Sequence, residues 1–148
     1  MEIKDNVALI TGGASGLGQA VVEKIIHHGG KVAILDINDE KAKELINNLN
    51  SNNVIYIKTN VMEEDSVKSA ISQIEKKFKK LNFVINCAGS GFGARILGKN
   101  GPHPLDIFKL IIDLNLVGTF NVMRLAAELI DKNADGDEKG VIINTASI

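Results

Sequence analysis

The pattern of hydrophobic and polar positions changes repeatedly between two kinds of segment along the chain. Short runs rich in Val, Ile and Leu predict buried strands, and longer stretches with apolar residues three or four positions apart predict amphipathic helices between them. The predicted strands are Val7–Thr11, Lys31–Asp36, Val54–Lys58, Phe83–Asn86 and Val141–Ala146. The predicted helices cover Leu17–His28, Asn38–Leu49, about Val67–Phe78 and about Leu105–Ile130.

These strands are apolar on both faces and are separated by helices, which is typical of βαβ units that form a parallel sheet. Because such crossovers are right-handed, the pattern predicts an α/β fold with a Rossmann-like, doubly wound parallel sheet in one domain over residues 1–148. The long helix is apolar on most of its circumference but carries Asp113, Asn115, Arg124 and Glu128. We therefore expect it to be buried on both sides within the protein rather than to span a membrane.

The last predicted strand is followed only by Ser147 and Ile148, so no helix follows to cover it. An uncovered hydrophobic strand promotes aggregation, and native folds usually hide such strands. The pattern therefore favours the interpretation that this sequence is the first part of a longer protein.

Composition narrows the functional classes. The 148 residues carry a net charge of −1 and lack Trp, which disfavours binding to nucleic acid or to an anionic membrane surface. No His, Cys, Asp and Glu cluster has the spacing of a metal site, so no metal is expected. One cysteine excludes an internal disulfide, and neither an apolar nor an Arg-rich leader opens the sequence, so a cytoplasmic location is expected.

Four glycines, Gly12, Gly13, Gly16 and Gly18, stand between the first predicted strand and the first predicted helix. In a βαβ unit, such a loop lets backbone N–H groups and a helix N-terminus approach a pyrophosphate. The alternative is a purely structural turn, because tight turns also need glycine.

Asp36 ends the second predicted strand, where a carboxylate can accept hydrogen bonds from the adenosine ribose. A 2′-phosphate about 4 Å away would be repelled by about 4 kcal/mol at an effective dielectric constant near 20. No basic residue lies in the glycine loop or directly after Asp36, which favours NAD over NADP. Asp36 could instead cap the turn that follows it.

Four runs resemble, in the same order, motifs of the classical short-chain dehydrogenase/reductase family: TGGASGLG, NCAG, DLNLVGTFNV and IINTAS. The resemblance implies that Asn115 holds a water in a proton relay and that Ser147 is the catalytic serine, which hydrogen-bonds the substrate oxygen. Asn115 could instead satisfy a carbonyl in a kinked helix near Gly118, and Ser147 could be a small residue at a strand end. The implied cofactor-binding residues are Thr11, Gly12, Ser15, Gly16, Leu17, Gly18, Asp36, Asn60, Val61, Asn86, Cys87, Ala88 and Gly89.

The sequence departs from the family pattern at two places. Asn60 stands where the family usually has an Asp that holds the adenine, and an amide oxygen can still accept that hydrogen bond. The family's general acid/base is a Tyr in a Y-x-x-x-K motif beyond the serine, whereas the only tyrosine here is Tyr56, outside any such motif. Cys87 stands where the family often has a second asparagine, and we interpret it as a small side chain beside the adenosine rather than a reactive thiol.

The resemblance implies an enzyme that transfers hydride between NAD and a secondary alcohol or ketone, with a 3-hydroxyacyl-CoA or a hydroxysteroid as the substrate. It also implies a homodimer or homotetramer formed through the long helix, and it leaves the mitochondrial matrix open as a second location. Two alternatives remain at this stage. The chain could be an inactive nucleotide-binding or subunit-interaction module, or it could be an unrelated Rossmann-like protein such as a methyltransferase.

Overall fold

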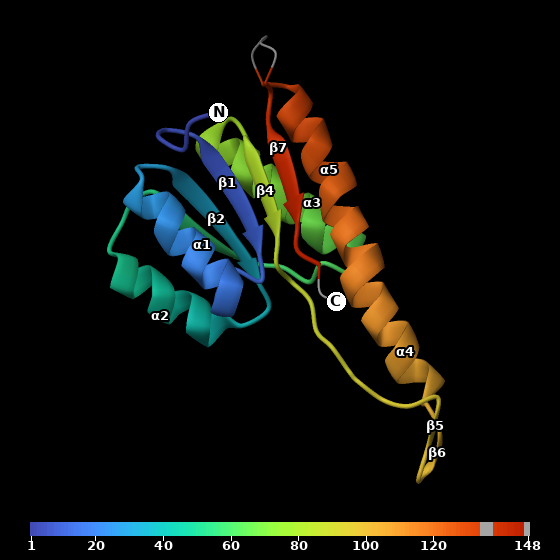
Figure 1. Cartoon of the computed structure of the whole chain (residues 1–148). Coiled ribbons are helices and arrows are strands. Elements are labelled where there is room, and N and C mark those ends of the chain that lie inside the picture. Colours follow the sequence, from blue (N-terminus) through green and yellow to red (C-terminus); the bar gives the residue numbers. More distant parts are fainter. Residues whose placement is uncertain (134–137, 147–148) are drawn as a thin grey trace.

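The computed structural model describes residues 1–133 and 138–146, and it has one main sheet with helices on both faces (Figure 1). The strands of this sheet are β1 (Val7–Thr11), β2 (Lys31–Asp36), β3 (Val54–Lys58), β4 (Phe83–Asn86) and β7 (Val141–Asn144). The helices that cover it are α1 (Gly16–His27), α2 (Asp39–Leu49), α3 (Glu64–Phe78) and α5 (Thr119–Asp131).

All five strands are parallel, and their order in the sheet is β3-β2-β1-β4-β7. The chain first builds outward from β1 to β3 and then returns to the other side of β1 with β4. The predicted doubly wound, Rossmann-like fold is therefore confirmed. The carboxyl ends of β1 and β4 meet at the point where the strand order reverses, which is where this class of fold binds ligands.

The core has two halves because each strand contributes alternate side chains to opposite faces of the sheet. Ala8, Ile10 and Ile34 pack toward α1 and α2, whereas Leu9 and Val84 pack toward α3 and α5. All five residues of β1 are buried. This burial explains why the sequence of β1 has no polar face.

The expectation that the long helix is buried on both sides is wrong. The stretch from Leu105 to Asp131 consists of α4 (Leu105–Ile112), a π-helical segment η1 (Asp113–Gly118) and α5. Only α5 packs on the sheet, whereas α4 extends past the edge of the domain and has no buried residue (Figure 1). By length and composition this stretch is the one helix among the described residues that could cross a membrane, and 22% of its most apolar window is buried.

The segment between β4 and α4, for which the sequence predicts neither a strand nor a helix, contains a small antiparallel hairpin. Its strands are β5 (Leu97–Gly98) and β6 (Gly101–Pro102), and it stands at the free end of α4 (Figure 1). Strands of two residues with one Gly in each leave no alternating pattern in the sequence, so sequence reasoning could not have found them.

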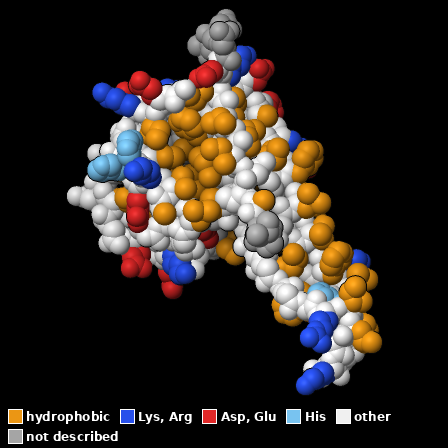
Figure 2. Space-filling view, viewed as in Figure 1, with side chains coloured by type: hydrophobic (Ala, Val, Ile, Leu, Met, Phe, Trp, Pro, Cys, Tyr) orange, Lys and Arg blue, Asp and Glu red, His pale blue; other side chains and the backbone are white. Residues whose placement is uncertain are grey.

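Hydrophobic side chains are exposed where β7 forms the edge of the sheet. Val141 and Ile143 are 40% and 49% exposed, because α1 covers β1 and β2 but not β7. Figure 2 shows hydrophobic side chains gathered over this part of the sheet and along the long helix. The sequence-based expectation of an uncovered last strand is therefore met within the described residues.

Candidate functional site

A cleft of about 490 Å³ lies at the carboxyl ends of the central strands. The glycine loop forms one wall, the end of β2 and the loop after β3 form another, and the segment after β4 forms the third. Among the predicted cofactor-binding residues, all but Thr11 and Asn86 line this cleft. The structure therefore brings together residues that lie far apart in the sequence.

The glycine loop is held tightly against its surroundings at two positions. Gly12 has a φ of +63°, and a β-carbon there would lie 2.8 Å from the Ala88 nitrogen. A β-carbon on Gly18 would collide with the carbonyl of Gly12 and would lie 2.9 Å from the α-carbon of Gly13. Only glycine fits at these two places, since in each case the opposing atoms belong to the backbone.

Gly16 differs from these two glycines. Its φ is +54°, but a β-carbon there would meet no atom within 4 Å, and the residue lines the cleft. Gly16 is also the first residue of α1, whose N-terminal N–H groups have no partner within the helix. The loop therefore leaves space for a group beside free N–H donors, which suits a pyrophosphate.

The carboxylate of Asp36 connects the end of β2 to both neighbouring loops. One oxygen accepts a hydrogen bond from the Ala14 N–H at 3.0 Å, and the other accepts one from the Asn38 N–H at 3.0 Å. The alternative that Asp36 caps the next turn therefore holds for one of its two oxygens, the one that accepts from the Asn38 N–H. Each carboxylate oxygen can accept more than one hydrogen bond, so a ribose hydroxyl can still be held.

Thr11 and Asn86 lie below the floor of the cleft and join three strands. The Thr11 hydroxyl accepts hydrogen bonds from the Cys87 and Ala88 N–H groups, each at 3.1 Å. The Asn86 amide donates to Asn144 Oδ1 at 2.8 Å, which ties β4 to β7. Neither residue lines the cleft; both fix the segment after β4, whose residues Cys87, Ala88 and Gly89 do line it.

Asn60 and Val61 lie on the cleft wall after β3, as predicted. The side chain of Asn60 is engaged in its own turn, because Oδ1 accepts from the Met62 N–H at 3.2 Å and Nδ2 donates to Glu63 at 2.8 Å. An amide oxygen has two lone pairs, so one remains for an adenine amino group.

A second cavity of about 610 Å³ adjoins the first, and Cys87, Ala88, Gly89 and Ser90 line both. Asn115 lines it from the π-helical segment and binds both backbone groups of Ser90. Its Nδ2 donates to the Ser90 carbonyl at 2.8 Å, and its Oδ1 accepts from the Ser90 N–H at 3.0 Å. The carbonyl that Asn115 satisfies therefore belongs to the loop after β4, and not to the helix near Gly118 as the structural alternative states.

The remaining candidates have different positions. Ser147 lies outside the described residues, and Thr145 and Ala146, just before it, line the second cavity. Cys87 is partly buried, and burial raises the pKa of its thiol, which agrees with the interpretation of an unreactive side chain. Within the described residues, no group of three or more His, Cys, Asp or Glu side chains could hold a metal ion.

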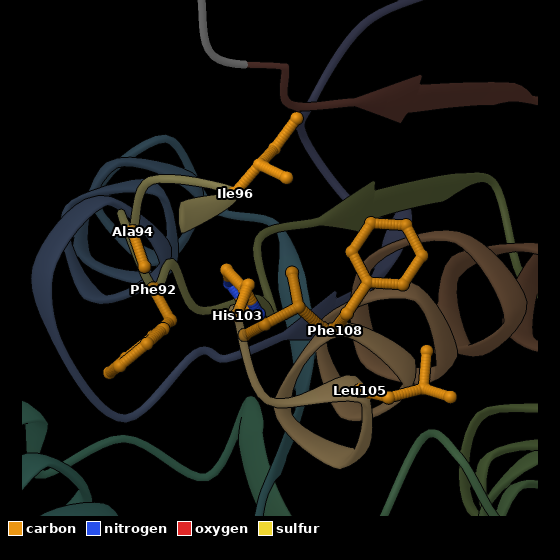
Figure 3. A pocket seen from close by; sticks show the side chains of 7 residues that line it. Phe92, Ala94, Ile96, His103, Leu105 and Phe108 are labelled. Atoms are coloured by element: carbon orange, nitrogen blue, oxygen red, sulfur yellow. The ribbon is translucent and has the colours of Figure 1, made fainter. Parts of the chain in front are cut away.

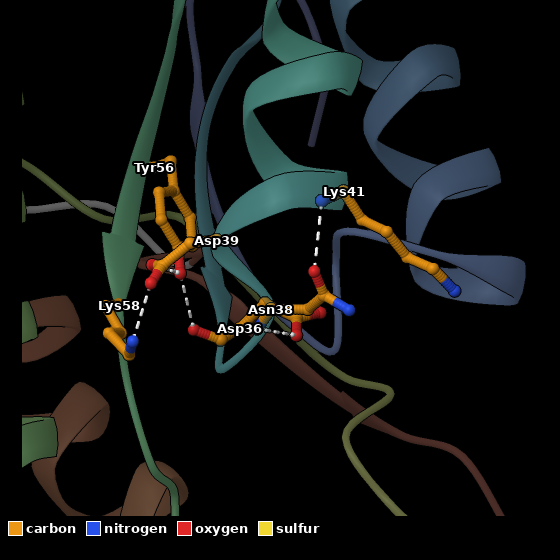
Figure 4. Close-up of polar contacts among 6 residues, drawn as sticks. All are labelled: Asp36, Asn38, Asp39, Lys41, Tyr56 and Lys58. Carbon is orange, nitrogen blue, oxygen red and sulfur yellow. Dashed lines mark hydrogen bonds and ion pairs between the residues drawn. The ribbon is translucent and has the colours of Figure 1, made fainter.

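Two features near the site were missed by sequence reasoning. Tyr56, Asp39 and Lys58 form a polar cluster beside Asp36 (Figure 4). Spacing along the sequence gives no sign of it, because Tyr56 and Lys58 lie on β3 whereas Asp39 is the first residue of α2. The second feature is an apolar pocket of about 510 Å³ between the hairpin segment and α4 (Figure 3). Its lining residues are Phe92, Ala94, Ile96, His103, Leu105, Phe108 and Ile111.

Comparison with known proteins gives the same picture over nearly the whole chain. The sequence model described as short chain dehydrogenase matches residues 6–148. The 3-hydroxyacyl-CoA dehydrogenase type-2 proteins of Drosophila melanogaster and Homo sapiens are 39% and 38% identical over 99% of this chain. The crystal structure of 3-hydroxyacyl-CoA dehydrogenase type-2 from Mycobacterium avium is 36% identical and superposes with a TM-score of 0.88 over 99% of this chain. The chain spans 58%, 57% and 59% of the length of these three proteins, respectively.

Proposed function

Because this chain belongs to the short-chain dehydrogenase family, we propose that the protein that carries it is an oxidoreductase that transfers hydride between NAD(H) and a secondary alcohol or ketone. The observation that carries the proposal is the cleft at the switch point between β1 and β4. It combines a glycine cradle, a helix N-terminus and an acid at the end of β2.

The residues of the cleft fit a nicotinamide dinucleotide. Gly16 leaves open space in front of the α1 N-terminus, where a pyrophosphate finds N–H donors. Asp36 is fixed by two backbone N–H groups and offers its remaining lone pairs to ribose hydroxyls. Among the described residues that line the cleft there is no Lys or Arg, which supports NAD over NADP because a 2′-phosphate would meet only negative charge.

When it is bound, the nicotinamide supplies the hydride chemistry, and the protein orients it and manages the proton. The residues of this chain that would handle the proton lie at the second cavity. Asn115 fixes the Ser90 backbone and thereby shapes the wall that both cavities share. We assign Ser147 to the substrate oxygen and Asn115 to the proton relay.

For the substrate we propose a 3-hydroxyacyl-CoA or a hydroxysteroid. The relatives named above bear the first activity in their names, and the apolar pocket beside α4 suits an acyl chain or a steroid. Arg95 and Lys99 in the hairpin segment could meet the phosphates of coenzyme A. Replacing both by Ala should lower turnover of an acyl-CoA and spare a neutral steroid alcohol, whereas equal loss for both would contradict this assignment.

A homodimer or homotetramer is proposed through the long helix. Leu105, Phe108, Leu116 and Phe120 are each more than half exposed on it, which is unusual for a free surface. Light scattering measures the molar mass of the native protein and of a Leu116→Glu variant in solution. A native protein with the molar mass of a monomer would refute the proposed assembly.

A second candidate function is nucleotide binding without dehydrogenation. The observation that favours it is that Tyr56 lies on β3, so that no phenol from the described residues lines the second cavity. Burial and the neighbouring Asp39 raise the pKa of its phenol, which makes it a poor general base.

The test measures binding and turnover separately in the native polypeptide that carries this chain. Titration with NADH, followed by nicotinamide fluorescence, reports the cleft, and NAD reduction with 3-hydroxybutyryl-CoA and with a hydroxysteroid reports the chemistry. Binding with turnover supports the dehydrogenase, and binding without turnover of any secondary alcohol supports the second candidate. A protein that binds no NADH contradicts both.

A further inference from the structure

The polar cluster beside Asp36 links the end of β3 to the first turn of α2. Asp39 accepts a hydrogen bond from the Tyr56 hydroxyl at 2.7 Å and forms an ion pair with Lys58 at 2.6 Å (Figure 4). The Tyr56 hydroxyl also lies 3.1 Å from the backbone carbonyl oxygen of Asp36. The cluster therefore joins the turn that carries Asp36 to the neighbouring strand.

Lys58 is placed to influence what binds at Asp36. The two residues face each other in the register of β2 and β3 and are the last residues of their strands. Neighbouring strands lie about 4.8 Å apart, and a lysine side chain is long enough to cross that distance. Lys41, in the first turn of α2, directs its side chain away from Asp36 and Asp39 (Figure 4).

In the structure, however, the Lys58 ammonium is held by Asp39. The hydrogen bonds from Lys58 and then from Tyr56 lower the pKa of the Asp39 carboxyl, so it remains ionised near neutral pH. Its position in the first turn of α2 also suits a negative charge, because the helix N-terminus is positive. Asp39 is therefore a stable partner for the lysine.

We propose that Asp39 is a second residue that determines selectivity for NAD, because it keeps the Lys58 ammonium from serving a 2′-phosphate at Asp36. This inference rests on the proposed NAD-binding function of the cleft. A free lysine next to Asp36 would offset the repulsion that Asp36 exerts on the phosphate of NADP. Asp39 is thus a positioning residue that acts through Lys58.

The experiment compares dissociation constants for NADH and NADPH in the native polypeptide at low salt. Asp39→Asn keeps an oxygen for Tyr56 and removes the charge that holds Lys58. We expect the ratio of the NADPH constant to the NADH constant to fall by up to about fivefold, which is the upper end of the range for an exposed ion pair. The effect should shrink as salt is added, because exposed charges are screened.

Two further variants separate the mechanism from a general loss of charge or structure. Asp131→Asn breaks a comparable exposed pair with Lys139, remote from the cleft, and should leave the ratio unchanged. Lys58→Met combined with Asp39→Asn should restore the wild-type ratio, because the lysine that faces Asp36 is gone and the pair again carries no net charge.

Two results would overturn the inference while leaving NAD binding intact. One is an unchanged ratio in Asp39→Asn. The other is an equal fall in the ratio with and without Lys58, which would mean that Asp39 itself repels the phosphate. A wild-type protein that binds no NADH would instead overturn the proposed function and this inference with it.

Discussion

Replacing Gly18 by Ala tests whether the glycine loop is held by close backbone contact. Gly18 is in the first turn of α1, and an added β-carbon would collide with the carbonyl of Gly12, with its carbonyl carbon at 2.8 Å and the α-carbon of Gly13 at 2.9 Å. These atoms belong to the backbone, so the loop and the helix must move apart.

The magnitude follows from two opposing effects. Overpacking of this kind costs about 1–3 kcal/mol, and the higher helix propensity of Ala offsets about 1 kcal/mol of this cost. We therefore expect a net loss of up to about 2 kcal/mol in the free energy of unfolding. In a domain of this size 1 kcal/mol lowers the melting temperature by about 2–4 °C, so Gly18→Ala should melt up to about 8 °C below wild type.

Thermal unfolding followed by circular dichroism measures this loss, and NADH titration shows whether the displaced loop still binds. Gly16→Ala is the matched control, because its β-carbon would meet no atom within 4 Å and only its positive φ disfavours Ala, by about 1–2 kcal/mol. Gly16→Ala should therefore lose a similar amount of stability without any backbone collision, and it should bind NADH more weakly, since the methyl group lies in the cleft. A Gly18→Ala protein that is as stable as wild type and binds NADH equally well would refute the reasoning.

Three more predictions concern the floor and walls of the cleft. Asp36→Asn should weaken NADH binding about tenfold or more, because the hydrogen bonds that a carboxylate makes to ribose are stronger than those of an amide; equal affinities in a fluorescence titration would contradict this. Thr11→Val should lower the free energy of unfolding by about 1–2 kcal/mol in denaturant melts, since the Ala88 N–H loses its acceptor while the Cys87 N–H keeps the Thr11 backbone carbonyl; Thr11→Ser should not lower it. Because burial raises the pKa of Cys87, less thiolate is present at neutral pH, and alkylation by iodoacetamide at pH 7 should be slower than for an exposed thiol; rapid alkylation at pH 7, read by mass spectrometry, would disprove it.

Periodicity was sufficient for the main sheet because its strands are short, apolar and bounded by turns. The bounds predicted for β1, β2, β3 and β4 agree with the structure, and only β7 ends earlier, at Asn144. The glycine loop and Asp36 could be placed because both follow directly after strands, whose carboxyl ends share one edge of a parallel sheet. The residues of this edge were therefore accessible from sequence alone.

Where the prediction failed, the cause is tertiary. The apolar circumference of the stretch from Leu105 to Asp131 predicts that another surface buries this helix. The pattern does not show whether that surface belongs to the same chain. In the structure, α4 is exposed. Asn115 lies in the π-helical segment and its side chain bonds Ser90, a contact between distant segments that no local pattern predicts. Tyr56 does not match the family's motif, and its partner Asp39 belongs to a different element. The sequence therefore does not predict the contact between them.

The central position of β1 also determines how the molecule opens on the timescale of hydrogen exchange. β1 has a hydrogen-bonded strand on each side, so its amide protons should be released only by global unfolding, whereas α4 and the hairpin have few buried contacts and should exchange through local opening. The glycine loop begins where β1 ends, at Thr11. The dinucleotide cleft is thus anchored to the most protected segment, while the pocket beside α4 is built from segments that can rearrange without disturbing it.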